Sequence, residues 1–350
     1  MEAKSRIPRV KAVLAREPLP ADDPRSLVDA EVPPPPAPQG HDLLVRVEAV
    51  SVNPLDCKVR MDTYGGHRAE RGERILGWDA AGTVEAVGEK VTLFGPGDAV
   101  YYAGSIMRPG SNAQLQLVDE RIVGPKPAAL DFSEAAALPL TSITAYEAIV
   151  DRMGVNAQGA DAGKTLLVIA GAGGVGSMAI QIACQLGLKV VATASRSESA
   201  QWCRGLGASH VVDPAQPLRE SLRSLGLDAA DCILNCADLD RYWLDMAEAV
   251  RPQGSLCSIV ANAAPIDLKA IQRKCARFAF EAMFTRSSLR TPDMIEQHRL
   301  LRRVADWVDA GAVRSTLMEK LEPIGAGNLR AAHQRVESRK MIGKIVVAGW

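Results

Sequence analysis

Residues 165–196 read TLLVIAGAGGVGSMAIQIACQLGLKVVATASR, and this stretch decides the fold. An apolar, β-branched run meets a glycine cluster, a segment with apolar residues at helical spacing follows, and a second apolar run closes the stretch. This order predicts one strand–helix–strand unit of about thirty residues. We expect its two strands to be parallel, because a crossover helix joins strands that run in the same direction.

The glycines of this stretch follow the spacing GxGxxG, which is typical of a loop that binds a dinucleotide. Gly171 is expected to permit the tight turn, Gly173 to let the backbone approach a pyrophosphate, and Gly176 to let helix and strand pack closely. The helix that follows presents free N–H groups and a positive dipole end to the phosphates. A glycine-rich connector without a ligand is the alternative. The candidate cofactor-binding residues of the loop are Gly171, Gly173, Gly174, Val175 and Gly176.

The composition is that of an ordinary globular chain of 350 residues, 47% hydrophobic and 23% charged. Its 41 basic and 41 acidic side chains cancel, and no basic cluster stands out, so we expect no nucleic-acid partner. No apolar run has the length of a membrane span and the N-terminus lacks a signal-peptide core, so we expect no membrane association and a cytoplasmic location. The seven cysteines include no CxxC pair, which indicates reduced thiols and no cysteine zinc site.

The chain divides into two patterns. Short apolar runs separated by glycine and proline fill roughly the first 130 residues and predict an irregular barrel or sandwich. A helix is expected from Ser133, and strands then alternate with helices, which predicts a doubly wound parallel sheet. Thr291-Pro292-Asp293 is expected to begin a long helix with Thr291 as its cap. The last strand could pair back into the N-terminal part. We expect strands at residues 11–15, 43–52, 82–87, 99–102, 113–118, 165–170, 190–194, 210–213, 232–236, 256–260 and 344–348, and helices at 175–186, 198–206, 218–225, 241–250 and 326–336.

Several words of this sequence occur together in one known family. They are VSVNPLDCKVR (50–60), ILGWDAAGTVEAVG (75–88), GDAVYYAG (97–104), AAALPLTSITAYEA (135–148), AGAGGVGSMAIQIA (170–183), LGASHVVD (206–213) and GKIVV (343–347). Over nearly its whole length the chain resembles the medium-chain dehydrogenase/reductase superfamily. It is most similar to the zinc-free quinone oxidoreductase branch, which includes proteins labelled zinc-type alcohol dehydrogenase-like.

The resemblance implies an α/β fold with two domains. One is a β-rich, GroES-like catalytic domain, residues 1–138 completed by residues 318–350. The other is a Rossmann domain with a doubly wound parallel sheet, residues 139–317. The last strand of that sheet would be an exposed edge, and pairing of two such edges would protect it. Together with the habit of the family, this predicts a homodimer.

The chain departs from zinc-dependent relatives at their metal site. Where those relatives have a Cys, a His and a third ligand that is usually Cys, this chain has Asn53, Trp78 and, near the third position, Leu140. A catalytic zinc ion needs three protein ligands from Cys, His or carboxylate. We therefore expect no metal site. His67 and Asp56 lack a third ligand, and we interpret them as a surface histidine and a structural carboxyl group.

The end of the second strand in the opening stretch indicates which nicotinamide cofactor binds. An NAD-preferring fold places Asp or Glu there, to bind the ribose 2′-hydroxyl. This chain has Ser195 and Arg196, whose hydroxyl and guanidinium suit the 2′-phosphate of NADPH. We therefore expect NADPH, with a solvated Arg196 at a helix start as the alternative. By the resemblance, Thr141 and Lys344 lie near the nicotinamide end.

The missing zinc ligands bear on the chemistry, because without a Lewis acid a carbonyl oxygen is not polarised. This favours acceptors that take hydride readily, namely quinones and α,β-unsaturated carbonyls. The resemblance places Asn53, Tyr64 and Arg60 near the cleft as candidate catalytic residues. Asn53 is the preferred hydrogen-bond donor, and a structural cap before Pro54 is its alternative role. The hypothesis is an NADPH-dependent quinone or enone reductase. A zinc-free carbonyl or alcohol dehydrogenase and a non-catalytic NADPH-binding protein are the alternatives.

Overall fold

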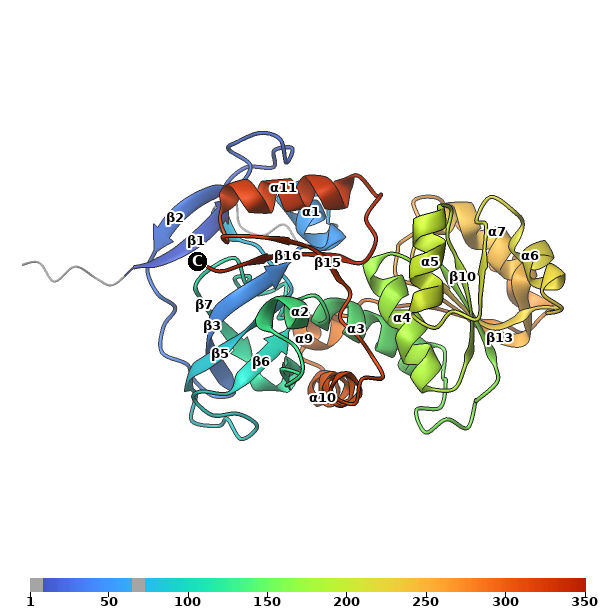
Figure 1. Cartoon of the computed structure of the whole chain (residues 1–350), viewed down its shortest axis with the longest axis horizontal. Coiled ribbons are helices and arrows are strands. Elements are labelled where there is room, and N and C mark those ends of the chain that lie inside the picture. The colour runs from blue at the N-terminus through green and yellow to red at the C-terminus, as the bar shows by residue number, and fades with distance from the viewer. Residues whose placement is uncertain (1–8, 65–72) are drawn as a thin grey trace, which may run out of the picture. The chain divides into compact units, whose positions relative to one another are not determined.

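The computed structural model describes residues 9–64 and 73–350 of the chain (Figure 1). His67 lies outside the described residues. The chain divides into two compact units, which are described separately below. Unit 1 comprises Met1–Leu140 and Phe284–Trp350, and unit 2 comprises Thr141–Met283. No helix within the described ranges combines the length and hydropathy needed to cross a bilayer.

Unit 2 is a doubly wound parallel sheet with helices packed against it. Within the described chain its strands follow the order β11-β10-β9-β12-β13-β14, and each neighbouring pair is parallel. This is the order 3-2-1-4-5-6 of a Rossmann fold, so the expected α/β class is confirmed. The elements are β9 (Thr165–Ile169), α4 (Gly174–Gln185), β10 (Lys189–Thr193), α5 (Ser197–Gly205), β11 (His210–Val212), α6 (Leu218–Ser224), β12 (Ala230–Asn235), α7 (Leu239–Ala249), β13 (Val250–Ser258), α8 (Lys269–Gln272) and β14 (Arg277–Phe280).

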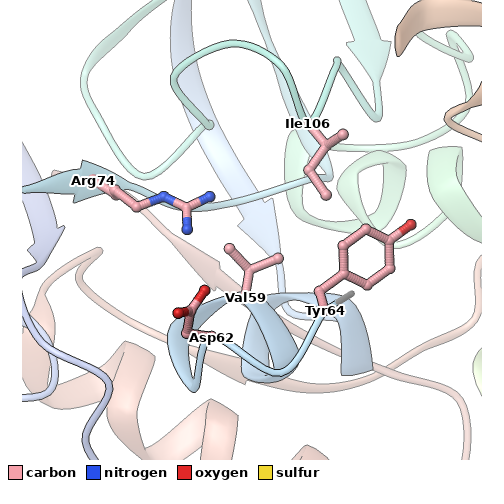
Figure 2. A pocket seen from close by; sticks show the side chains of 5 residues that line it. All are labelled: Val59, Asp62, Tyr64, Arg74 and Ile106. Carbon is pink, nitrogen blue, oxygen red and sulfur yellow. The ribbon is translucent and has the colours of Figure 1, made fainter. Parts of the chain in front are cut away.

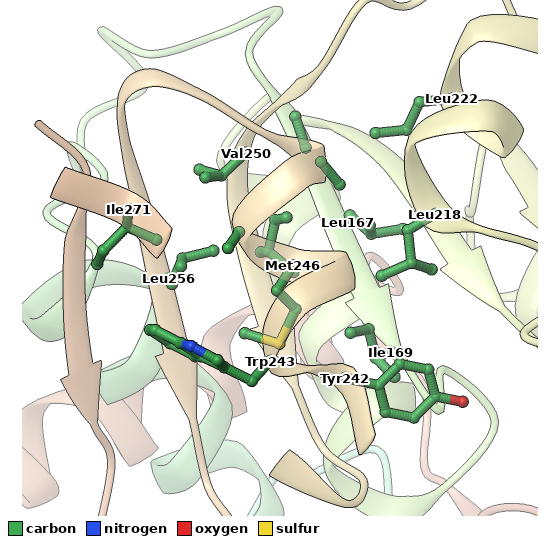
Figure 3. Close-up of a cluster of buried hydrophobic side chains, with 14 of the residues drawn as sticks. Leu167, Ile169, Leu218, Leu222, Tyr242, Trp243, Met246, Val250, Leu256 and Ile271 are labelled. Carbon is green, nitrogen blue, oxygen red and sulfur yellow. The ribbon is translucent and has the colours of Figure 1, made fainter. Parts of the chain in front are cut away.

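A cluster of buried apolar side chains fixes one face of this sheet (Figure 3). Leu167 and Ile169 of β9 and Leu256 of β13 belong to it, together with Trp243 and Met246 of α7. Every residue of β9 is buried, as a parallel strand covered on both faces requires. Burying each such side chain contributes about 1.5–3 kcal/mol. The sheet is therefore a rigid support for the loops that follow its strands.

Unit 1 contains two sheets. The larger one follows the order β15-β16-β3-β5-β6-β8, with β7 also paired to β3, and the smaller one follows the order β2-β1-β4. The central strand β3 pairs antiparallel with β5, β7 and β16. The strands are β1 (Val10–Ala15), β2 (Val28–Val32), β3 (Asp42–Ser51), β4 (Arg74–Ile75), β5 (Ala80–Val87), β6 (Ala99–Tyr102), β7 (Leu115–Asp119), β8 (Val123–Pro125), β15 (Leu317–Leu321) and β16 (Lys344–Ala348).

Helices of different lengths complete unit 1. Helix α11 packs on α1 and on β16, and α2 packs on β3 and β5. Helix α10 packs on β8 and on the 3₁₀ turn η1. The helical elements are α1 (Pro54–Arg60), η1 (Glu120–Ile122), α2 (Phe132–Ala136), α9 (Thr285–Leu289), α10 (Ile295–Asp309) and α11 (Ala326–Glu337). The chain enters unit 2 within α3 (Pro139–Tyr146), which continues as the π-helical turn η2 (Glu147–Arg152).

The C-terminal segment returns to unit 1, but earlier than the sequence indicated. Strand β16 pairs with β3, which confirms that the last strand joins the N-terminal sheet. The return begins at Phe284, however, and not at residue 318. The reason is that α10 also belongs to unit 1: the Tyr101 hydroxyl donates to the Leu301 carbonyl at 2.6 Å, and His298 Nδ1 lies 2.7 Å from the Val123 carbonyl oxygen.

One local expectation was wrong, and one strand of unit 2 was missed. Helix α10 begins at Ile295 and not at Thr291. The Thr291 hydroxyl donates to one oxygen of Asp293, and Arg286 Nε donates to the other at 3.0 Å, so these residues form a turn before the helix. Strand β14 was not expected from the sequence. It is four residues long, too short to show a strand period, and its pairing with β13 is what makes it a strand.

Candidate functional site

The glycine loop between β9 and α4 turns at an alanine. Ala170 has a φ of 62°, in the left-handed region, whereas Gly171 does not. The expected role of Gly171 in the turn is therefore wrong. A Cβ atom on Gly171 would lie 2.7 Å from the Cβ of Ala192 in β10. Gly171 is required because the neighbouring strand leaves no room for a side chain.

The other two glycines of the motif face different surroundings. A Cβ atom on Gly176 would lie 2.4 Å from the Ala170 carbonyl oxygen, so a side chain there would separate the helix from the loop. A Cβ atom on Gly173 would meet only that same oxygen, at 3.6 Å, and no other atom within 4 Å. Gly173 has a φ of −71°, which any residue can adopt. The space beside Gly173 is therefore open.

The start of α4 presents backbone donors. Gly173 is the N-cap, and Gly174, Val175 and Gly176 form the first turn. The Ser177 N–H donates to the Gly173 carbonyl at 2.8 Å, which is the first bond of the helix ladder. The N–H groups of the preceding three residues have no acceptor inside the helix, because a helix start offers none. Together with the open space beside Gly173, this geometry fits the pyrophosphate of a dinucleotide.

Ser195 and Arg196 follow β10 at the same edge of the sheet. The Gly171 N–H donates to the Thr193 carbonyl at 3.0 Å, and the Ala170 N–H donates to the Thr193 hydroxyl at 2.9 Å. These bonds hold the end of β10 beside the glycine loop. Ser195 and Arg196 are exposed, and Arg196 is the N-cap of α5. A hydroxyl and a guanidinium thus stand where an NAD-preferring fold has a carboxylate.

In unit 1, Asn53 is buried and its side chain is fully occupied. Its Nδ2 group donates to the Trp78 carbonyl at 3.0 Å and to Asp79 Oδ2 at 2.8 Å, and its Oδ1 accepts from Lys344. Its backbone N–H donates to Asp56, whose pKa burial raises to about 7. Both amide hydrogens are therefore used inside the protein. Asn53 has none left for a substrate oxygen, and we propose that it is a positioning residue.

Lys344 begins β16, and its ammonium group is the centre of this network. Its Nζ donates to the Val52 carbonyl at 3.2 Å, to Asp79 Oδ2 at 3.1 Å and to Asn53 Oδ1. An ammonium has three hydrogens, so none remains for a cofactor, and the expected nicotinamide contact is not supported. Asp79 is fully buried and also accepts the Leu140 N–H at 2.7 Å. Burial raises the pKa of Asp79, whereas Lys344 and the hydrogen bonds oppose that shift.

These residues do not fit a catalytic zinc ion. The side chains at the three expected ligand positions are an amide, an indole and an isobutyl group, from Asn53, Trp78 and Leu140. The nearby carboxylate of Asp79 is bound by the Lys344 ammonium. Over residues 9–64 and 73–350 no group of three His, Cys, Asp or Glu side chains is arranged to hold a metal. The positive charge at this position is that of the Lys344 ammonium group, which lies beside the Asp79 carboxylate.

Arg60 is a structural residue of unit 1. Its guanidinium is fully buried and donates to the Leu19 carbonyl at 3.0 Å, to His333 Nδ1 at 2.8 Å and to Glu337 at 2.5 Å. These contacts tie α1 to α11. Burial, and then the charge of Arg60, lower the pKa of His333 to about 3, so this histidine is neutral. The expected catalytic role of Arg60 is wrong, because its guanidinium is fully buried and donates to Leu19, His333 and Glu337.

Tyr64 lines a shallow depression with Val59, Asp62, Arg74 and Ile106 (Figure 2). Its ring lies beside Val59 and Ile106. As lined by the described residues, the depression is too narrow to admit a water molecule. Burial raises the pKa of the Tyr64 hydroxyl, which keeps it protonated. Its role in catalysis remains a prediction.

Four further polar residues were missed by the sequence analysis or left without a defined contact. Asn235 and Ser258, at the carboxyl ends of β12 and β13, are fully buried and hydrogen-bonded to each other at 3.1 Å. A polar residue ending an apolar run was the available signal. Trp78 Nε1 is a buried donor without an acceptor among the described residues. Thr141 is buried in α3, and its expected contact with the nicotinamide remains a prediction.

Comparisons with known proteins agree with this architecture. A family model of the alcohol dehydrogenase GroES-like domain matches residues 39–128, and one of zinc-binding dehydrogenases matches residues 206–347. A zinc-type alcohol dehydrogenase-like protein of Staphylococcus aureus is 42% identical over 313 residues, which cover 89% of this chain and 92% of that protein. The chain belongs to the medium-chain dehydrogenase/reductase superfamily. It is therefore an oxidoreductase of the medium-chain type, a family that binds nicotinamide cofactors.

Two other relatives place the chain within this superfamily. The quinone oxidoreductase of Lama guanicoe is 32% identical over 235 residues, which cover 67% of this chain and 68% of that protein. A crystal structure from Rhizobium etli, assigned to the zinc-dependent alcohol dehydrogenases, is 49% identical with a TM-score of 0.92 and covers 99% of both chains. The word zinc in these names describes those proteins. The residues at the corresponding locus of this chain do not fit the metal.

Gly173→Val is expected to abolish most NADPH binding without unfolding the protein. The backbone of Gly173 suits any residue, whereas a valine side chain would fill the open space that a pyrophosphate needs. Losing charge-assisted hydrogen bonds of about 1.5–3 kcal/mol corresponds to about a ten- to hundredfold higher Kd. Titration calorimetry gives the Kd, and circular dichroism checks the fold. Gly95→Val, at an open glycine in unit 1, is the matched control. Normal NADPH binding by folded Gly173→Val would contradict the assignment.

Lys344→Met is expected to lower the free energy of unfolding by about 3–5 kcal/mol, because it leaves Asp79 buried and unpaired. The double variant with Asp79→Asn should recover part of this loss, since the new amide is neutral and can still accept the Leu140 N–H. Lys320→Met, which removes an exposed pair with Glu322, is the control and should cost less than about 1 kcal/mol. Urea unfolding measures all three. A wild-type midpoint for Lys344→Met would refute the structural role of the pair.

Proposed function

We propose that this protein is an NADPH-dependent reductase that transfers hydride to a quinone or an α,β-unsaturated carbonyl without a catalytic zinc ion. One observation supports this most strongly. At the locus where zinc-dependent relatives bind their metal, Asn53, Asp79 and Lys344 form a closed network of buried hydrogen bonds. Such a site has no Lewis acid to polarise an isolated carbonyl. Quinones and conjugated carbonyls accept hydride without one.

The residues that would hold NADPH lie at the carboxyl end of the parallel sheet. The first turn of α4 would bind the pyrophosphate, beside the open face of Gly173. Ser195 and Arg196 would bind the 2′-phosphate, which a carboxylate at this point would repel. When bound, the reduced nicotinamide supplies the hydride. Asn235 ends β12, which pairs with β9, and Ser258 ends β13, which pairs with β12. Their mutual hydrogen bond holds both polar groups in place.

Trp78 is the best candidate for a donor to the substrate oxygen. Its indole N–H is buried and, among the described residues, meets no acceptor. A buried donor left unpaired costs about 1–3 kcal/mol, so its retention calls for a ligand or a water molecule as acceptor. The oxygen of an enone or quinone gains charge as hydride adds, and an indole N–H would stabilise that charge. Asn53 cannot take this role because both its amide hydrogens are in use.

The expected partners follow from the same features. The quinone oxidoreductase among the relatives supports a small-molecule quinone or enone as substrate.

We also propose a homodimer formed through β14, which is an edge strand of the parallel sheet and exposes 46% of Phe280. Light scattering would give the mass, and Phe280→Asp should weaken the assembly. Equal numbers of basic and acidic side chains argue against nucleic acid as a partner.

NADPH oxidation is expected with a benzoquinone and with an alkenal, and not with a saturated aldehyde. The purified protein should contain no stoichiometric zinc, and a chelator should leave the rate unchanged. Absorbance at the nicotinamide band and elemental analysis test both points. One zinc ion per chain, or turnover with the aldehyde alone, would contradict the proposal. NADPH binding without any turnover would indicate a binding protein.

Trp78→Phe should lower kcat about a hundredfold if the indole N–H is the donor.

Arg196→Ala is expected to raise the Kd for NADPH by about ten- to hundredfold, because a charge-assisted pair with phosphate contributes about 1.5–3 kcal/mol. The Kd for NADH should hardly change. Ser195→Asp should invert the preference, since a carboxylate repels the phosphate and accepts the free 2′-hydroxyl. Arg204→Ala, an exposed arginine of the same helix, is the control for net charge. Unchanged NADPH affinity of Arg196→Ala at low salt would place the phosphate elsewhere.

A further inference from the structure

The Trp78 indole is oriented by packing and not by a hydrogen bond. The Gly77 carbonyl accepts the Ser111 N–H at 3.0 Å, which fixes the main chain before Trp78. The Trp78 carbonyl accepts Asn53 Nδ2 at 3.0 Å, which fixes the main chain after it. The indole N–H, by contrast, meets no acceptor among the described residues. The second side-chain torsion of tryptophan has broad minima, so neighbouring side chains must select the direction in which the N–H points.

Phe284 makes an edge-to-face contact with this indole. The centroids of the two rings lie 6.4 Å apart, and their planes meet at 78°. Aromatic rings favour this arrangement, because the positive edge of one ring meets the negative face of the other. Both side chains are buried, with 1% of Trp78 and 7% of Phe284 exposed. The contact restrains rotation of the indole, since a turned ring would lose it.

The backbone of Phe284 is itself fixed. Phe284 is the N-cap of α9, and its carbonyl accepts the Ser288 N–H at 2.7 Å and the Ser287 hydroxyl at 3.3 Å. Arg286 of the same helix donates from Nε to Asp293 at 3.0 Å, which joins α9 to the turn before α10. The Phe284 ring therefore projects toward Trp78 from an ordered helix start.

The two segments of unit 1 meet unit 2 at residues that are bound to Trp78 and Asp79, which are consecutive in the chain. The first segment ends at Leu140, whose N–H donates to Asp79 Oδ1 at 2.7 Å. The second segment begins at Phe284, whose ring contacts Trp78. Asp79 is in turn bound by the Lys344 ammonium. The Trp78–Phe284 contact is therefore part of the same buried arrangement as the Lys344 network.

We propose that Phe284 is a positioning residue, which holds the Trp78 indole N–H in the direction in which it meets a substrate oxygen. The inference rests on the function proposed above, in which this N–H is the donor to that oxygen. Phe284 acts through Trp78 and requires no contact with the substrate. Its effect on the rate follows from geometry, because a displacement of about 1 Å can cost about a hundredfold. The restraint on the indole exists whether or not a substrate is bound.

A double-variant cycle tests whether Phe284 acts through Trp78. Phe284→Leu keeps an apolar side chain but removes the ring, and should lower kcat for a benzoquinone by about ten- to hundredfold, while the Kd for NADPH stays the same. Adding Phe284→Leu to Trp78→Phe should lower kcat no further, because the N–H that Phe284 positions is already absent. Losses that multiply in the double variant would overturn the proposal.

Phe94→Leu is the matched control for the cycle. It makes the same change in unit 1, at a ring that contacts His298 edge-on with centroids 5.6 Å apart. We expect it to keep the wild-type kcat, because His298 is held by its own contact with the Val123 carbonyl oxygen. A loss of kcat in Phe94→Leu as large as that in Phe284→Leu would mean that removing any such ring slows the enzyme, and would overturn the proposal.

Nitrogen-15 relaxation of the indole groups tests the positioning without turnover. The chain has five tryptophans, and the indole signal that disappears in Trp78→Phe is that of Trp78. In Phe284→Leu the order parameter of this N–H should fall from about 0.85 to below about 0.6, while the other tryptophan signals keep their wild-type values. Phe284→Met, which fills the space with an unbranched chain, serves if the leucine variant does not fold. An unchanged order parameter in a folded variant would overturn the proposal.

The two measurements separate this inference from the proposed function. A wild-type kcat in Trp78→Phe would show that the indole is not the donor, and the catalytic part of the inference would fail with that assignment. A slow Trp78→Phe enzyme together with a rigid indole in Phe284→Leu would overturn the positioning role alone. A mobile indole, and a kcat no lower in the double variant than in Trp78→Phe, would support both.

Discussion

Unit 1 depends on the hydrogen bonds and the ion pair that the Lys344 ammonium group makes. It lies at the start of the last strand and binds the Val52 carbonyl, the Asn53 amide oxygen and the Asp79 carboxylate. The same carboxylate accepts the Leu140 N–H. One cation thus joins the C-terminal strand, the segment before α1, the turn before β5 and the start of α3. Each of these segments is distant in sequence, so the network closes the domain around a single charged centre.

Unit 2 depends on close approach of backbone rather than on charge. At Gly171 and Gly176, added side chains would meet β10 and the loop at 2.7 Å and 2.4 Å. Both glycines let β9, the glycine loop after it and α4 pack without a gap. Gly173 belongs to the same motif but has open space beside it. The motif therefore combines two positions that serve packing with one, Gly173, that leaves the space a ligand would need. The sequence pattern already distinguished Gly173 from Gly176, and the structure corrects the role of Gly171.

The doubly wound parallel sheet of unit 2, most strand positions and the superfamily could be predicted from the sequence, because glycine spacing and apolar periodicity are local signals. The errors came where long-range contacts decide. Nothing local shows that α10 packs on β8, so the return at Phe284 was placed too late. The resemblance placed Arg60 near the cleft as a catalytic candidate, but His333 and Glu337, far along the chain, bind its guanidinium. Lys344 was placed at the cofactor because its actual partners, at residues 52, 53 and 79, are also far from it in the sequence.

We infer that the network around Lys344 would let this fold keep its shape without a metal. A zinc ion contributes a positive charge that binds ligands from separate segments, and an electrophile that polarises a substrate oxygen. The Lys344 ammonium supplies the first property, since it binds a carboxylate and two oxygens from separate segments. It cannot supply the second, because its three hydrogens are all donated within the protein. On the function proposed above, the chemistry would be left to acceptors that need no Lewis acid and to a weaker donor such as the Trp78 indole N–H. This separation of the structural role from the electrophilic role is what we infer to distinguish this chain from its zinc-dependent relatives.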